Sequence, residues 1–326
     1  MNERSGQSRR EWSAASSHPV RACLSGEDLD WLGGKSVCVA LDLHTTVRAD
    51  DPGAGEPEGD GIPVEPWATQ VWTYLRERVP GMAAEPPGVV ASTRAPSASG
   101  LSSSTALILG LFEIFAGSSP ACAGIPLSIL VQWAYEFEFT IFNGGGMDHV
   151  SITRGGATLF QGRSRGLPVL AEQMAFPAEW ALLVVDSGMS KNTQDHVRSV
   201  RRQEAAGDPA LARYMRVAND ASEAVWSAIR SRELVALGEG MELAHTAMRD
   251  HQGMSTPFLE QLRDIAWATA WVRLKLSGAG GGGALVAVCA RADAASVSDA
   301  LRSRYGAVFP GVRVHLVDAV APRDEW

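Results

Sequence analysis

Hydrophobic and polar positions along the chain change repeatedly between the period of a strand and the period of a helix. Alternating segments rich in β-branched residues predict strands, and an apolar face that recurs every three to four residues predicts helices. The predicted strands span residues 36–47, 88–92, 151–160, 180–185, 283–289 and 311–317. The predicted helices span residues 67–78, 101–116, 125–139, 195–250 with a break at 207–209, 257–271 and 294–305.

The order of these elements predicts an α+β protein of two domains. Strands and helices do not alternate regularly, as they would in a doubly wound parallel sheet, and 326 residues suffice for about two cores. Turn residues between 163 and 177 place the domain boundary there, which gives an N-terminal domain of residues 18–172 and a C-terminal domain of 173–326. Residues 1–17 are polar and lack periodicity, so we expect a flexible leader.

Composition and charge exclude several classes of protein. Hydrophobic residues make up 45% of the chain and charged residues 20%, which is typical of globular proteins and excludes global disorder. With 29 Lys and Arg against 37 Asp and Glu, the net charge of −8 argues against nucleic acid or an anionic membrane as a partner. The apolar segment 101–116 is too polar for a membrane span. Four scattered cysteines and no secretory signal favour a cytoplasmic location. We expect a monomer or a homodimer.

A serine-rich segment, residues 97–105, lies between a predicted strand and a buried helix. Small residues allow a close approach of the backbone to a ligand, and a helix start offers free N–H groups and the positive end of a dipole to a phosphate. The hydroxyls could also cap the helix or bind Mg²⁺. No Gly-Lys-[Ser/Thr] follows, so this is not a Walker A loop. An ordinary serine cap is the alternative.

Glycines dominate a second segment, Lys275–Gly283. Five of the six residues from Gly278 are glycine, which has a large cost in conformational entropy. A flexible linker would explain this composition, but the segment leads from a predicted helix into an apolar strand. We therefore expect a backbone that packs closely against a partner segment or a substrate.

A third segment, Gly26–Gly34, places the carboxylates of Glu27, Asp28 and Asp30 beside Trp31. Carboxylates accept hydrogen bonds from sugar hydroxyls, and an indole face packs on a sugar ring. The segment could equally be a solvated turn. Composition alone leaves both interpretations open.

Taken together and in this order, the three segments resemble those of the GHMP kinases, the family that includes galactokinase, homoserine kinase, mevalonate kinase and phosphomevalonate kinase. Pro96–Ser104 matches the motif P-x-x-x-G-L-S-S-S, and Lys275–Gly283 matches K-L-[ST]-G-A-G-G-G-G. The resemblance extends from residue 19 to about 320. The glycine-rich segment Lys275–Gly283 is closer to the corresponding motif of mevalonate kinase than to that of galactokinase.

The opening motif of galactokinases, R-x-N-L-x-G-E-H-x-D-[YW], is matched in part. Cys23 replaces its Asn and Asp28 replaces its His, so the sequence indicates a divergent sugar kinase rather than an orthodox galactokinase. The matching positions are Arg21, Leu24, Gly26, Glu27, Asp30 and Trp31.

The resemblance implies a fold and a set of roles. The fold would comprise an N-terminal domain like ribosomal protein S5 domain 2 and a ferredoxin-like C-terminal domain, with ATP and substrate between them.

The resemblance also implies residue roles. Asp148 would act on the attacking hydroxyl, and Arg21 would hold Asp148 ionised. The implied nucleotide-binding residues are Pro96, Ser97, Ser99, Gly100, Leu101, Ser102, Ser103 and Ser104. The implied substrate-binding residues are Glu27, Asp28, Asp30, Gly145, Gly146, Gly280 and Gly281. The implied Mg²⁺ ligands are Ser103, Ser104 and Glu136, which precedes Asp148 by the twelve residues of the galactokinase pattern.

The function implied is transfer of the γ-phosphoryl group of ATP to the anomeric C1 hydroxyl of a sugar or sugar phosphate, such as a galactose-like sugar or a heptose or octose phosphate. Alternatives are a mevalonate-type alcohol kinase, an ATP-dependent decarboxylase and a non-catalytic sensor of sugar and ATP. A phosphate on the substrate would need extra cations. Candidates are Lys191 and the arginines between 198 and 202, although these arginines could simply form a solvated helix face.

Overall fold

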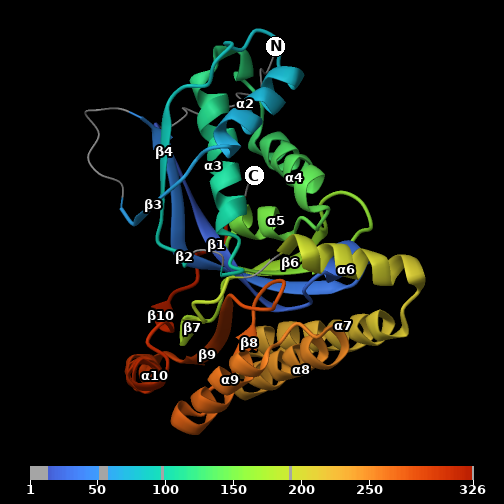
Figure 1. The fold of residues 1–326 in the computed structure, drawn as a ribbon, viewed down its shortest axis with the longest axis vertical. Helices are drawn as coiled ribbons and strands as arrows, with labels where there is room; N and C mark the ends of the chain where they lie inside the picture. The colour runs from blue at the N-terminus through green and yellow to red at the C-terminus, as the bar shows by residue number, and fades with distance from the viewer. Residues whose placement is uncertain (1–13, 51–57, 97–98, 191–192, 325–326) are drawn as a thin grey trace, which may run out of the picture.

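The computed structural model describes residues 14–50, 58–96, 99–190 and 193–324. They form two antiparallel sheets with helices packed around them (Figure 1). The α+β class predicted from the order of elements is therefore confirmed.

The larger sheet is built mostly from the N-terminal half of the chain. Its order is β3-β4-β2-β5-β6, with β1 also paired to β2. Strand β2 is long and alternating, and it is the centre of the sheet because it pairs with β1, β4 and β5. Its strands are β1 (Ala15–Ser25), β2 (Lys35–Ala49), β3 (Asp60–Ile62), β4 (Val89–Thr93), β5 (Ala157–Gln161) and β6 (Val169–Met174).

The smaller sheet has the order β10-β7-β9-β8. Its central strands are apolar runs that are buried almost throughout, since helices cover them. Its strands are β7 (Trp180–Asp186), β8 (Lys275–Leu276), β9 (Ala284–Ala290) and β10 (Arg313–Val317).

Helices cover both faces of the larger sheet. Helix α3 packs on β1 and β2 from one side, and the hairpin of α7 and α8 packs on β1 from the other (Figure 1). Helix α3 is apolar on nearly all sides, as expected for a helix buried between a sheet and other helices. The helices are α1 (Leu29–Leu32), α2 (Trp67–Arg78), α3 (Ser103–Ser118), α4 (Leu127–Phe142), α5 (Met147–Arg154), α6 (Thr193–Ala206), α7 (Pro209–Ser231), α8 (Leu234–Gln252), α9 (Pro257–Ala270) and α10 (Ala294–Val308), with short 3₁₀ turns at Pro120–Cys122 and Arg291–Asp293.

Four sequence predictions need correction. The strand expected at 151–160 is helix α5 followed by β5, because Gly155 and Gly156 adopt left-handed φ values of 69° and 65° and end the helix. The helical region 195–250 has a second break, at Arg232 with φ 58°. The expected leader 1–17 is too long, since β1 begins at Ala15, and residues 1–13 lie outside the described residues.

The fourth correction concerns the domain boundary. A boundary after residue 172 would cut β6, which belongs wholly to the larger sheet. Across the described ranges, no helix combines the length and the apolar character needed to cross a bilayer.

Candidate active site

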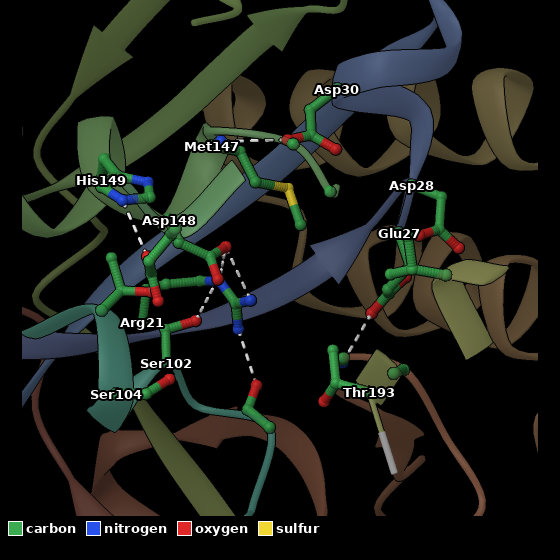
Figure 2. A pocket seen from close by; sticks show the side chains of 18 of the residues that line it. Arg21, Glu27, Asp28, Asp30, Ser102, Ser104, Met147, Asp148, His149 and Thr193 are labelled. Carbon is green, nitrogen blue, oxygen red and sulfur yellow. Dashed lines mark hydrogen bonds and ion pairs between the residues drawn. The ribbon is translucent and has the colours of Figure 1, made fainter. Parts of the chain in front are cut away.

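A cavity of about 300 Å³ is lined by segments that lie far apart in the sequence (Figure 2). Strand β1 and the loop after it, the start of α3, helix α4, the start of α5, the start of α6 and the glycine segment all contribute to its wall. The lining residues are Arg21, Glu27, Asp28, Asp30, Trp31, Ser99, Gly100, Ser102, Ser103, Ser104, Thr105, Glu138, Phe139, Gly144, Gly145, Met147, Asp148, His149, Thr193, His196, Val197, Gly278 and Ala279.

Asp148 lies in the first turn of α5 and is held by two side chains from other elements (Figure 2). The guanidinium of Arg21 donates from Nε to Oδ1 over 2.8 Å, and its second nitrogen lies 2.7 Å from the same oxygen. The hydroxyl of Ser102 donates to Oδ2 over 2.5 Å. Burial alone would raise the pKa of Asp148, but the charge of Arg21 and the Ser102 hydrogen bond outweigh it and lower the pKa below its ordinary value. Asp148 is therefore ionised at neutral pH.

The serine segment forms the N-terminus of α3 and faces the same cavity. Ser102 adopts a left-handed φ of 64°, so the helix begins at Ser103, and its first N–H groups lie next to the cavity. Arg21 connects this segment to Asp148, since it also donates to the carbonyl oxygen of Gly100 over 2.7 Å. This arrangement suits an anion placed beside Asp148.

The glycine segment packs against the serine segment. The N–H of Ala284 donates to the carbonyl oxygen of Ser99 over 2.7 Å, and a Cβ on Gly283 would lie 2.6 Å from that oxygen. Gly283 has φ 80°, so this position needs glycine for both reasons. The close backbone approach expected from the composition is therefore present, and the partner is the protein itself.

Gly280 and Gly281, which the sequence analysis assigned to the substrate, do not line the cavity. Gly281 donates to the carbonyl oxygen of Met254 over 2.7 Å, and a Cβ on Gly280 would lie 2.4 Å from that same oxygen. Their role here is to pack the turn against Met254. Gly278 and Ala279 line the cavity instead.

The acidic loop Gly26–Gly34 lines the cavity with all three of its predicted carboxylates. Asp30 accepts a hydrogen bond from the N–H of Met147 over 3.0 Å. A Cβ on Gly145 would lie 1.8 Å from an oxygen of Asp30, so glycine is required there. Burial raises the pKa of Asp30 to about 7, and the neighbouring Asp148 and Asp28 add to the effect of burial. Asp28 lies 2.6 Å from Nε2 of His196, which comes from α6.

Gly146, the other glycine predicted to bind substrate, lies outside the cavity lining. A Cβ there would meet Leu167 and Tyr135 at 2.6 and 2.9 Å. Glycine at this position therefore serves the packing of α5 against the adjacent core.

Glu27 is tied to the glycine segment. Its Oε1 pairs with the ammonium of Lys275 and accepts from the N–H of Gly278 over 3.3 Å. Lys275 also donates to the carbonyl oxygen of Cys23 over 3.0 Å. The other oxygen of Glu27, Oε2, is buried and has no hydrogen-bond partner among the described residues.

The structure does not place Glu136, the predicted metal ligand, at the cavity; Glu138 from the same helix lines it instead. Glu136 accepts hydrogen bonds from Tyr74 over 3.0 Å and from Gln132 over 2.9 Å. Two residues along a helix amount to a rotation of about 200°, so Glu138 points to the opposite side of α4 and lines the cavity.

Glu138 is buried among groups that approach its Oε2. Thr105 donates to this oxygen over 2.9 Å. Nε2 of His149 lies 2.8 Å from it but is not aligned for a hydrogen bond. Glu138 thus lies between the start of α3 and the start of α5.

The remaining predicted residues divide into three groups. Pro96 and the buried Leu101 shape the serine segment without lining the cavity, while Ser99, Gly100, Ser103 and Ser104 do line it. Ser97 and Lys191 lie outside the described residues. Arg201, expected on a solvated face or at a substrate phosphate, places its guanidinium 3.9 Å from the centre of the Trp31 ring and donates to the carbonyl oxygen of Asn143. That face of Trp31 is therefore covered.

The chain is similar in sequence and in fold to known kinases. A family model described as GHMP kinases C terminal matches residues 226–307. A mevalonate kinase of Pyrococcus abyssi (strain GE5 / Orsay) is 27% identical over 303 residues, which cover 83% of this chain and 87% of the relative. The chain is thus similar to the GHMP kinases in its C-terminal part and to a mevalonate kinase over most of its length. These similarities indicate a small-molecule kinase, a phosphotransferase with an alcohol group as acceptor.

Two solved structures, a mevalonate kinase and a galactokinase, share the fold. The L. major mevalonate kinase in complex with R-mevalonate has a TM-score of 0.74 and 18% identity, over 96% of this chain and 99% of that one. The Lactococcus lactis galactokinase complexed with galactose has a TM-score of 0.72 and 17% identity, over 97% of this chain and 96% of that one. At these identities the likeness concerns the fold alone.

Several residues that line the cavity were not found from the sequence. Glu138 had a signal, since the same helix carries two glutamates that face opposite ways. His149 follows Asp148 directly, but a lone histidine is more often structural. Thr193 and His196 come from a helix of the C-terminal half, and no local pattern connects them to the acidic loop.

Proposed function

We propose that this protein transfers the γ-phosphoryl group of ATP to a hydroxyl of a sugar-like polyol, at the anomeric position. The observation that carries the proposal is the position of Asp148. It is held ionised by Arg21 and Ser102 and borders the same cavity as the N-terminus of α3. A carboxylate there can take the proton of a hydroxyl that attacks a phosphorus atom bound at the helix start.

The start of α3 is the proposed site of the nucleotide phosphates. Its N–H groups and the positive end of its dipole favour negative charge. The hydroxyls of Ser103 and Ser104 border the cavity at the same point. Because the backbone is fixed by the contact between Gly283 and Ser99, the phosphates would meet donors that are already in place.

The donor set here fits a Mg²⁺ ion that arrives with the nucleotide. Within the described ranges, no group of three acidic, histidine or cysteine residues forms a complete metal site. Mg²⁺ commonly uses one or two carboxylates together with substrate phosphates. Glu138 and the hydroxyls of Ser103 and Ser104 would hold it. When bound, Mg²⁺ neutralises charge on the phosphate oxygens.

Arg21 has two tasks in this mechanism. It holds Asp148 in one orientation, and it stabilises the ionised form of Asp148, so that the base is ready at neutral pH. As the acceptor proton moves to Asp148, Arg21 and Ser102 keep the protonated group in place.

The acceptor is assigned to the side of the cavity lined by Glu27, Asp28 and Asp30. Hydroxyl groups of a polyol are suitable donors to three carboxylates. A carboxylate-bearing acceptor such as mevalonate would need a cation there. Among the described lining residues, Arg21 is the one lysine or arginine, and its guanidinium already pairs with Asp148.

The test is acceptor-dependent release of ADP. Purified protein with Mg²⁺ and ATP is assayed against free and phosphorylated sugars and mevalonate, and ³¹P NMR identifies the phosphorylated hydroxyl. Release with a sugar and a new anomeric phosphate is expected. Release with mevalonate alone, or none with any acceptor, would overturn the proposal.

A matched pair of variants tests the metal assignment. Glu138→Gln removes the carboxylate at the cavity, whereas Glu136→Gln makes the same change on the opposite side of α4. We expect the first variant to need at least about tenfold more Mg²⁺ for half-maximal rate, and the second to behave as the parent. Equal Mg²⁺ dependence in both variants would contradict the role of Glu138.

A further inference from the structure

Asp30 is a buried carboxylate that forms no ion pair within the described part of the protein, and the charge of Arg21 acts on it only from a distance. Only 2% of its surface is exposed, and its hydrogen bond comes from the neutral N–H of Met147. No ion pair between Asp30 and a Lys, Arg or His occurs in residues 14–50, 58–96, 99–190 and 193–324. A buried carboxylate without a cation is unfavourable, so a ligand that supplies one would stabilise it.

Glu27 presents a second incomplete group to the same cavity. Its Oε1 is saturated by Lys275 and Gly278, but its buried Oε2 accepts nothing from the described residues. Glu27 is 2% exposed and lines the cavity. A buried acceptor atom of this kind needs a donor, and the cavity is the side from which a ligand can bring one.

The charges of the lining point in one direction. Its described carboxylates are Glu27, Asp28, Asp30, Glu138 and Asp148, against the guanidinium of Arg21 and the imidazoles of His149 and His196. Glu27 pairs with Lys275 and Asp28 with His196, whereas Asp30 has no such partner among the described residues. Arg21 is engaged by Asp148, and Arg201, the other arginine nearby, lies over Trp31. An anionic acceptor would therefore meet like charge, and a cationic acceptor would meet opposite charge.

Resting on the proposed function, we propose that the acceptor carries a protonated amine in addition to its reactive hydroxyl, as amino sugars and aminocyclitols do. The ammonium lies against Asp30, and a donor of the same molecule reaches Oε2 of Glu27. The hydroxyl then points toward Asp148. This assigns the acidic loop to recognition of charge as well as of hydroxyl groups.

The test compares acceptors that differ in the amine alone. The probes are galactosamine, galactose and N-acetylgalactosamine, together with glucosamine, glucose and N-acetylglucosamine, because acetylation keeps the nitrogen and removes its charge. Binding is measured by calorimetry with Mg²⁺ and a non-hydrolysable ATP analogue, and turnover by ADP release. We expect the amine of at least one set to bind about tenfold or more tightly than both of its uncharged counterparts.

Asp30→Asn is the decisive variant, because an amide oxygen can still accept from Met147. It should reduce the preference for the amine over its uncharged counterparts to about onefold, because the amine loses more affinity than the uncharged sugars do. Glu223→Gln is the matched control, since it removes an exposed carboxylate that pairs with Lys35 outside the cavity. It should keep the full preference.

The outcomes separate the two proposals. Uncharged sugars that bind as well as the amines, or no binding of any probe, would overturn the amine proposal. ADP release with uncharged sugars would leave the kinase proposal standing in that case. Tight binding of amines without ADP release from any acceptor would overturn the kinase proposal and support the amine site. A preference for the amine that persists in Asp30→Asn would show that Asp30 does not bind the ammonium, and would overturn the amine proposal as stated.

Discussion

Asp30 in α1 and Asp148 in the first turn of α5 line the same cavity, but their pKa values shift in opposite directions. Asp148 has Arg21 and the Ser102 hydroxyl as partners, and its pKa falls. Asp30 accepts a hydrogen bond from one backbone N–H and has two acidic neighbours, while Arg21 acts on it without forming an ion pair, and its pKa rises to about 7. Burial raises the pKa of both carboxyl groups, although Asp148 is partly exposed and Asp30 is not. The comparison shows that the counter-charge decides which carboxylate is a ready base and which one awaits a partner.

Removing the base at Asp148 should have the largest effect. Asp148→Asn preserves the size of the side chain but cannot accept the acceptor's proton, so we expect kcat to fall by about 10³-fold. Stopped assays of ADP release measure this, and nucleotide binding by calorimetry checks that the serine segment is intact. A variant that retains the parental kcat would show that Asp148 is not the base, and the contrast with Asp30 would then have no catalytic meaning.

Removing the cation beside Asp148 should make it more like Asp30. We expect Arg21→Met to lower kcat by about 10²-fold. It should also move the acid limb of the pH–rate profile to higher pH. Since Arg21 lowers the pKa of Asp148, its loss raises that pKa, and the base is protonated at a higher pH. An acid limb that stays in place would mean that Arg21 does not set the ionisation of Asp148.

Asp30 should also affect the stability of the protein without ligands. Its raised pKa means that the folded protein holds a proton more tightly than the unfolded chain does, so this stabilisation is present below the ordinary pKa of 3.8 and is lost as pH rises toward 7. Asp30→Asn removes the loss. Without ligands, we expect the variant to gain roughly 2–4 kcal/mol relative to the parent between pH 4 and pH 8, measured by urea unfolding. An equal difference at both pH values would contradict the raised pKa.

The smallest expected effect belongs to Ser102. Ser102→Ala removes one of the hydrogen bonds to Asp148 but leaves the charge of Arg21. We expect kcat to fall by about tenfold or less and the acid limb to shift in the same direction as in Arg21→Met, but by less. Ser103 is the matched control, since no hydrogen bond joins it to Asp148 in the described structure. Ser103→Ala should leave the acid limb of the pH–rate profile in place. A shift equal to that of Arg21→Met would place the main control of ionisation at Ser102.

Features determined by local pattern were predictable from the sequence. The alternation of β2 and the all-round apolar character of α3 gave the correct elements, and the fold class followed from their order. The segment 151–154 misled because its short alternation looks like a strand, whereas the helix depends on where Met147 and Gly155 begin and end it. Strand β1 was not predicted from the sequence, and its first residues are polar.

Site residues that belong to a sequence motif could be predicted. Residues whose place depends on which side of a helix faces the cavity could not. Arg21, Asp148 and the serine segment do meet at one cavity, as the resemblance implied. Glu136 was chosen by spacing, but spacing does not say which side of a helix faces inward. The pairing of Glu27 with Lys275 joins residues nearly 250 positions apart, and no local pattern reports it.

That same pairing has a consequence for how the protein is made. Glu27 is synthesised early, yet the ammonium that neutralises it belongs to the last sixth of the chain, next to the glycines that fix Ser99. A nascent chain still lacking Lys275 holds most of the larger sheet but cannot settle Glu27 in its native position. Catalytic competence should therefore arise only near the end of translation, after the ribosome has released the segment around Lys275.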